Sequence, residues 1–74
     1  MQDPRENREL MSAVQDYINS NGLQLDSRAR FGWGIDCVSV EVDNHVVLWI
    51  SLPPLSNYGI HETEYTDKYL RKTA

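Results

Sequence analysis

The stretch CVSVEVDNHVVLWISL, residues 37–52, decides the fold of this chain. In its first half, the valines at positions 38, 40 and 42 alternate with small or polar residues, and this period of two predicts a strand with one apolar face. The second half, residues 46–52, is rich in β-branched and aromatic side chains and predicts a second strand. A short polar segment separates the two, so we expect an antiparallel β-hairpin.

The length of the hairpin loop determines which side chains of the second strand share the valine face. A two-residue loop would place Val47 and Trp49 beside Val42. A three-residue loop, residues 43–45, instead gathers the aliphatic side chains on one face: Val42, Val46, Leu48 and Ile50. We therefore expect the three-residue loop, whose asparagine or histidine tolerates a left-handed backbone. Trp49 and Val47 then lie on the opposite face.

The segment before the hairpin predicts an amphipathic helix with both ends marked. Asp3 is a suitable N-cap, followed by Pro4 at the first helical position and by Glu6 in the place of a capping box. Apolar residues recur at helical spacing and form one stripe: Leu10, Met11, Val14, Tyr17 and Ile18. Gly22 fits the left-handed position that ends a helix, with Leu23 beyond it as the apolar contact of a Schellman motif.

The segment after the hairpin is ambiguous. A Pro-Pro pair, residues 53–54, removes backbone donors and ends the second strand, and residues 55–59 have the composition of a loop. Beyond them acids precede bases, as the dipole of a helix prefers, and Tyr65 and Tyr69 have the spacing of one helical turn. Residues 58–65 also alternate like a short strand, but we expect a short C-terminal helix.

Together these elements predict a single α+β domain over residues 1–74. An N-terminal amphipathic helix packs on a small antiparallel sheet of two or three strands around the central hairpin, and the tail closes the fold. A chain of 74 residues with 41% hydrophobic side chains can form one small core but not two. The expected stability is modest, or shared with a partner.

Charge and cysteine content limit the kinds of partner and compartment. The net charge of −4 repels a phosphate backbone, and the basic residues are not gathered in one place, so nucleic acid is disfavoured as a partner. Cys37 is the only cysteine, which favours a reducing compartment. No apolar run approaches the roughly 18 residues that span a membrane. We therefore expect a cytoplasmic protein that does not contact a membrane.

A second distinctive stretch, RARFGWG at residues 28–34, precedes the hairpin. In a structural interpretation its two rings cover the end of the core, while the glycines bend the chain toward the hairpin. In a functional interpretation the bend exposes residue types that are enriched in binding hot spots: Arg28, Arg30, Phe31 and Trp33. The structural interpretation is favoured, because so small a domain needs its aromatic side chains inside.

Residues 30–33 are also similar to the aromatic strand of RNA-recognition motifs, in which rings on a sheet stack on bases. The similarity covers only these residues. Gly34 stands where that motif has a β-branched residue, and no strand is expected before the first helix. We therefore assign the chain to no family, and a nucleic-acid binder that uses the arginines and rings of residues 28–33 is an alternative function.

Trp49 is the aromatic residue whose cover matters most for function. The expected register places it with Val47 on the face away from the aliphatic cluster. In one interpretation the tail covers it, through Tyr65, Tyr69 or Leu70. In the other, a second copy or a different protein covers it, because isolated apolar patches mark interaction sites. Val47 and Trp49 therefore join the residues of the second stretch as candidates for partner binding.

Few residues could form a catalytic or metal site: Cys37, His45 and His61, with Asp36 or Glu62. The cysteine and the histidines lack the close paired spacing of zinc ligands. A chain this short also has little volume for the sheltered pocket that a Cys-His nucleophile needs. We expect no catalytic residue, no metal and no cofactor, and a minimal enzyme that uses Cys37 or a histidine is the second alternative function.

The expected function is binding without catalysis. Small, acidic chains of this type are common among phage and mobile-element proteins that block host machinery. We expect a regulator, adaptor or inhibitor that acts by occupying the surface of a protein, either a different protein or a second copy in a homodimer.

Overall fold

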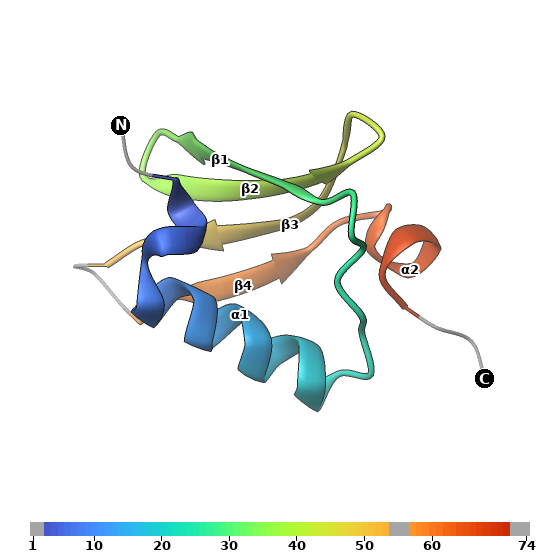
Figure 1. Ribbon diagram of the computed structural model, residues 1–74, viewed down its shortest axis with the longest axis horizontal. Helices are drawn as coiled ribbons and strands as arrows, with labels where there is room; N and C mark the ends of the chain where they lie inside the picture. The colour runs from blue at the N-terminus through green and yellow to red at the C-terminus, as the bar shows by residue number, and fades with distance from the viewer. Residues whose placement is uncertain (1–2, 54–56, 72–74) are drawn as a thin grey trace.

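The computed structural model describes residues 3–53 and 57–71 and has an α+β fold (Figure 1). Its elements in chain order are η1 (Pro4–Glu6, a 3₁₀ helix), α1 (Arg8–Ser20), β1 (Arg30–Gly34), β2 (Cys37–Val42), β3 (His45–Ser51), β4 (Gly59–Glu62) and α2 (Thr66–Tyr69). The strands form one antiparallel sheet in the order β1-β2-β3-β4. The expected α+β class is confirmed, but the sheet has four strands rather than two or three.

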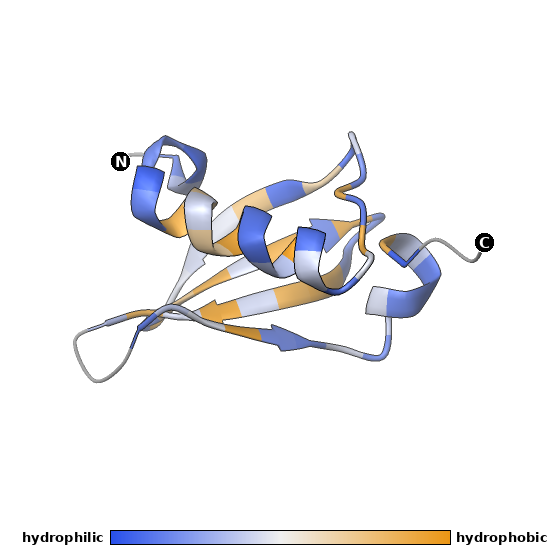
Figure 2. Cartoon of the chain, turned by 90° about the horizontal axis from the view of Figure 1, so that it is seen from below, coloured by the Kyte–Doolittle hydropathy of each residue, from blue (hydrophilic) through white to orange (hydrophobic). Residues whose placement is uncertain are grey.

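The helix α1 lies across one face of the sheet and turns its apolar stripe toward the strands (Figures 1 and 2). It buries Leu10, Val14 and Ile18. The sheet supplies the larger part of the core: Val38, Val40, Val42, Val47, Leu48 and Ile50. Leu23 and Leu70, which follow the two α-helices, complete it. The core therefore lies between α1 and one face of the sheet.

The expected N-terminal helix is divided at Asn7. Asp3 does cap a helix, because its carboxylate accepts from the N–H of Arg5 at 2.9 Å and its own N–H donates to the carboxylate of Glu6 at 3.1 Å. That helix is the short η1, however. The helix α1 begins at the next residue after Asn7, whose side-chain oxygen accepts from the N–H of Leu10 at 3.2 Å. Asparagine is a favourable N-cap for the same reason as aspartate.

The end of α1 is as the sequence predicts. Gly22 has φ +66°, and the N–H of Leu23 donates to the carbonyl of Ile18 at 3.0 Å, which is the long bond of a Schellman motif. Leu23 then forms an isolated antiparallel bridge with Arg71. The segment after α1 is thereby tied to the segment after α2.

The loop of the central hairpin is shorter than expected. Val42 pairs with His45, so the loop consists of Asp43 and Asn44 alone. Both have positive φ, 52° and 66°, as the tight type I′ turn of a two-residue hairpin requires. The prediction of a three-residue loop is therefore wrong.

A β-bulge in β3 restores the aliphatic face that the longer loop was expected to provide. Val40 pairs with Leu48 on one side of the bulge, and Glu41 pairs with Val46 on the other, which leaves Val47 as the extra residue. Leu48 is therefore buried, as expected. The two valines exchange their expected positions, because Val47 is fully buried and Val46 is 36% exposed.

Two threonines after β4 satisfy the backbone carbonyls at this bulge. The Thr63 hydroxyl donates to the carbonyl of Val46 and the Thr66 hydroxyl donates to the carbonyl of Val47, each at 2.5 Å. Thr66 is completely buried and also accepts from the N–H of Thr63 at 2.8 Å. Since β4 pairs with β3 only from Leu48 onward, these hydroxyls replace the strand pairing that is missing at the bulge.

Two segments form strands that we did not assign from the sequence. The strand β1 contains Gly32 and Gly34, so these glycines do not bend the chain as expected but pair with β2. The tail contains β4 followed by α2, which is a strand and one helical turn rather than a helix alone. The strand β3 ends before the Pro-Pro pair, as expected, and residues 54–56 of that pair and loop lie outside the described residues.

Candidate binding face

The sheet has a second face, opposite to the one that packs against α1. Cross-strand partners point to the same side of a sheet, and the register therefore gives the members of this face: Arg30, Gly32, Gly34, Cys37, Ser39, Glu41, Val46, Trp49, Ser51, Gly59 and His61. None of these residues is buried. Figure 2 shows α1 on the other side of the strands. We call this surface the open face.

Trp49 stands near the middle of the open face and is 40% exposed. Its indole stacks on the imidazole of His61, its cross-strand partner on β4, with ring centroids 3.9 Å apart and planes 17° from parallel. The stack covers the side of the indole that is turned toward β4. The other side of the indole is turned toward Ser39, its partner on β2. Trp49 and His61 therefore form a raised aromatic half of the open face.

Small residues occupy the half of the open face that belongs to β1 and β2. Gly32 and Gly34 bring no side chain, and a Cβ at Gly34 would lie 2.7 Å from the Cys37 Sγ. A larger residue at position 34 would require the Cys37 side chain to turn away, and the glycine keeps this half low. A surface hollow of about 220 Å³ lies at the same edge of the sheet, lined by Arg30, Phe31, Gly32, Glu41 and Asn44.

The open face carries one positive and one negative side chain, although the chain as a whole has a net charge of −4. These are Arg30 and Glu41, which are cross-strand partners. The ion pairs among the described residues are formed by three other arginines, Arg5, Arg28 and Arg71. The open face is therefore locally neutral, and its two charges are available to a partner.

The structure separates the binding residues that the sequence grouped in residues 28–33. Phe31 and Trp33 point to the α1 side, because their cross-strand partners are the buried Val40 and Val38. Phe31 packs against the core, and Trp33 is 39% exposed. Arg30 points to the opposite side of the sheet, in the open face, because its cross-strand partner is Glu41. The expected cluster is thus divided between the two faces of the sheet.

Arg28 and Val47 also lie away from the open face. The guanidinium of Arg28 pairs with Asp26 at 3.0 Å and with Asp43 at 3.2 Å, which joins the segment before β1 to the turn after β2. The hydrogen bonds from Arg28 hold the pKa of the Asp26 carboxyl below its usual value. Val47 is fully buried, so its expected position beside Trp49 on an exposed face is wrong.

The tail covers Trp49 with a residue that the sequence did not suggest. Of the three expected covers, Tyr65 and Tyr69 gather instead at His45, with ring centroids 4.2 Å and 6.0 Å from its imidazole, and Leu70 belongs to the core. His61 covers one side of the indole in their place. The alternation in residues 58–65 is the sequence pattern that could have indicated His61 as the cover. It predicts a strand, and a strand would assign the His61 side chain to one defined face of the sheet.

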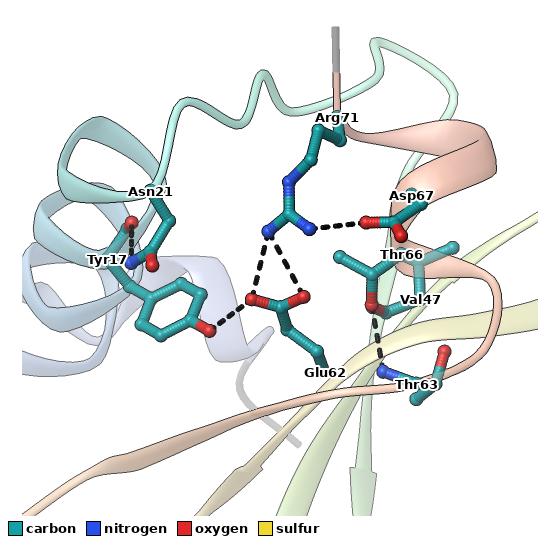
Figure 3. A network of polar contacts seen from close by, with 8 residues as sticks. All are labelled: Tyr17, Asn21, Val47, Glu62, Thr63, Thr66, Asp67 and Arg71. Carbon is teal, nitrogen blue, oxygen red and sulfur yellow. Dashed lines mark hydrogen bonds and ion pairs between the residues drawn. The ribbon is translucent and has the colours of Figure 1, made fainter. Parts of the chain in front are cut away.

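A polar network holds the strand that carries this histidine (Figure 3). The Tyr17 hydroxyl of α1 donates to Glu62 of β4 at 2.5 Å, and the Arg71 guanidinium donates to both oxygens of Glu62 at 3.1 Å and also to Asp67. The hydrogen bond to Glu62 raises the pKa of the Tyr17 phenol, because the carboxylate disfavours a phenolate beside it. The network therefore fixes β4 next to α1 and keeps its neighbour His61 in the open face.

The residues considered for catalysis or metal binding occupy two separate places. His61 Nε2 is 3.4 Å from the Ser51 hydroxyl, and Cys37 is the cross-strand partner of Ser51, all on the open face. His45 lies at the start of β3, stacked on Tyr65. Within residues 3–53 and 57–71, no group of three histidine, cysteine or acidic side chains is arranged to hold a metal ion.

Comparisons with protein-family models, with curated proteins and with solved structures found no match. Among the described helices, none has the length and apolar character that would be needed to cross a membrane.

Proposed function

We propose that this chain is a small non-catalytic binding protein, a regulator, adaptor or inhibitor, that uses its open face to occupy the surface of a protein. The observation that carries the proposal is the position of Trp49, 40% exposed at the centre of a sheet face on which no residue is buried. A tryptophan can bury 150–250 Å² of surface. A domain this small would gain stability by placing that area in its core, so its position in the open face favours a role in binding.

The composition of the open face also supports a protein as the partner. Tryptophan and arginine are enriched in the energetic centres of protein interfaces, and here Trp49 and Arg30 share a face with glycine and serine residues that allow close approach. Ligand and catalytic sites are concave, whereas the open face is the exposed surface of a sheet. The acidic chain repels phosphates, which disfavours nucleic acid.

The proposal is tested with two matched tryptophan variants. Trp49→Ser removes the exposed ring of the open face, and Trp33→Ser removes a ring of nearly equal exposure, 39%, from the α1 side. A protein captured by the immobilised wild-type chain is purified, and its affinity for each variant is measured by titration calorimetry. We expect Trp49→Ser to weaken binding at least about tenfold.

The control defines the opposite result. Trp33→Ser is expected to bind within about twofold of the wild-type affinity, because its ring lies outside the open face. Equal affinities of the wild type and Trp49→Ser for the purified partner would show that the open face is not the binding surface.

A further inference from the structure

The two halves of the open face are complementary in shape. Trp49 and His61 form the raised half on β3 and β4, and Gly32 lies in the low half on β1, with Ser39 between them. Neighbouring strands are about 4.8 Å apart, so the backbones of Gly32 and Trp49 are about 10 Å apart across the sheet. A two-fold axis that runs along β2 above Ser39 would bring the raised half of a second copy over the low half of the first. Symmetric dimers require a self-complementary surface of this kind.

Charge favours the open face as the place where two copies meet. Each copy has a net charge of −4, so most pairs of surfaces repel one another. The open face has no net charge, since Arg30 and Glu41 cancel. In the arrangement about the β2 axis, the Glu41 side chains of the two copies meet at the axis, and the long side chain of Arg30 beside them reaches toward Glu41 of the second copy and offsets their repulsion. Neither residue takes part in the ion pairs formed by the described residues.

From shape and charge together we infer that the partner of the open face is a second copy of this chain, packed sheet against sheet in a two-fold dimer. This inference rests on the proposed function and names its partner. Four strands of four to seven residues, about 4.8 Å apart, give the open face a projected area of roughly 400 Å², which is less than the ~800 Å² per partner of a standard stable interface. We therefore expect a weak and reversible dimer.

Sedimentation equilibrium of the complete chain, from about 1 μM to 1 mM, measures this association. The weight-average mass of the wild type is expected to rise with concentration from 8.6 kDa toward twice that value. Trp49→Ser is expected to raise the dissociation constant at least about tenfold, and the matched Trp33→Ser variant is expected to leave it within about twofold. Urea unfolding at 1 μM checks that each variant is folded as a monomer.

A pair of charge reversals tests the dimer without removing the ring. Arg30→Glu gives the open face two acids, and Glu41→Arg gives it two bases, so each variant alone is expected to associate less than the wild type. An equimolar mixture of the two variants is expected to restore the dimer, because opposite faces then meet. A role of these residues within one chain would not produce restoration by mixing, and this test is independent of Trp49→Ser.

The only cysteine reports on the same interface. Cys37 is half-buried in the open face, so its rate of reaction with a thiol reagent is expected to fall at least about twofold between dilute and concentrated wild-type protein. The rate is expected to depend less on concentration in Trp49→Ser than in the wild type. A dimer that forms through another surface would leave the rate unchanged in both proteins and would overturn the inference.

Two further results would overturn it. One is a wild-type mass that stays at 8.6 kDa up to 1 mM. The other is a dimer that survives both Trp49→Ser and the charge reversals. Neither result decides the proposed function, which fails separately if a purified different protein binds the wild type and Trp49→Ser with equal affinity.

Discussion

The two tryptophans are almost equally exposed, 39% for Trp33 and 40% for Trp49, but they lie on opposite faces of the sheet. Trp33 is the cross-strand partner of the buried Val38, on the side that α1 covers. Trp49 is the partner of Ser39, on a face where no residue is buried. The exposed fraction of a ring therefore does not identify a binding residue by itself. A partner can contact a ring together with the residues around it only where the whole face of the sheet is exposed.

The same contrast holds for the faces as a whole. The α1 side carries the aliphatic core, whose buried valine, leucine and isoleucine side chains are at most 7% exposed. The open face combines one aromatic stack with glycine, serine and cysteine. Substitutions on the first side should change the stability of the monomer, and substitutions on the second should change binding.

Leu48→Ala should give the largest loss of stability and tests this contrast within one strand. Leu48 is completely buried, so truncation removes apolar burial and leaves a cavity, at a cost of roughly 2–5 kcal/mol. Val46→Ala on the same strand is the control, because Val46 is exposed in the open face and should cost less than about 0.5 kcal/mol. Urea unfolding of both variants measures the difference, and equal midpoints would break the distinction between the faces.

Thr66→Val should lower the free energy of unfolding by about 1–3 kcal/mol. The substitution tests whether the threonine hydroxyl stabilises the bulge that places Val47 on one face of the sheet and Val46 on the other. The substitution keeps the size of the side chain but leaves the Val47 carbonyl without its buried hydrogen bond. Thr63→Val is the control, because its hydroxyl bonds to the Val46 carbonyl on the exposed side, where water can replace it. Thermal unfolding should show a larger drop for Thr66→Val, and the reverse order would contradict this account of the bulge.

Gly22→Val should lower the free energy of unfolding by about 1 kcal/mol or more, because it disturbs the end of α1, the helix that packs on the core side of the sheet. No atom lies within 4 Å of the position that a Cβ would take at Gly22, so the loss comes from the backbone, whose φ of +66° resists a β-branched residue. Gly22→Asn should cost less, because asparagine tolerates this conformation. A denaturation midpoint that does not change in Gly22→Val would refute the role of this ending.

Tyr17→Phe should give the smallest effect, visible as a change in pH dependence. The pKa of Tyr17 is raised in the folded chain above its usual value of 10.0, mainly by the bond to Glu62. The hydroxyl therefore contributes stability that is present below pH 10.0 and is lost as the pH rises through the folded-state pKa. The difference in urea midpoint between wild type and Tyr17→Phe should shrink above about pH 10. A difference that stays constant to pH 11 would exclude the linkage.

Local alternation was enough to place most side chains of the hairpin, because the period of a strand depends only on neighbouring residues. It placed Leu48 in the core and Trp49 opposite to it. Alternation did not predict the two-residue turn or the bulge at Val47. The shorter turn and the extra residue shift the register by one residue in opposite directions, so the residues beyond the bulge still lie on their expected faces. The bulge is held by the hydroxyls of Thr63 and Thr66, which are far along the chain, so no local pattern encodes it.

The candidate site was predictable only in part for a similar reason. Trp49 and Arg30 were among the expected binding residues, but the importance of His61 depends on the pairing of β4 with β3, which brings it against Trp49. Phe31 and Trp33 were grouped with Arg30 because they are neighbours in sequence. Neighbours of opposite parity on a strand point to opposite faces, and Gly32 and Gly34 obscured the strand.

The bridge between Leu23 and Arg71 has a consequence for the order in which the chain folds. Each strand pairs with its neighbour in sequence, so the hairpins close short loops. The bridge, together with the bond from the Gln24 N–H to the Leu70 carbonyl at 2.8 Å, closes a loop that contains the whole sheet. The entropy lost in closing that long loop is offset only once the sheet exists. We therefore expect the meander of strands to form early and the docking of α1 to complete folding, so that the open face is assembled before the core side is sealed from water.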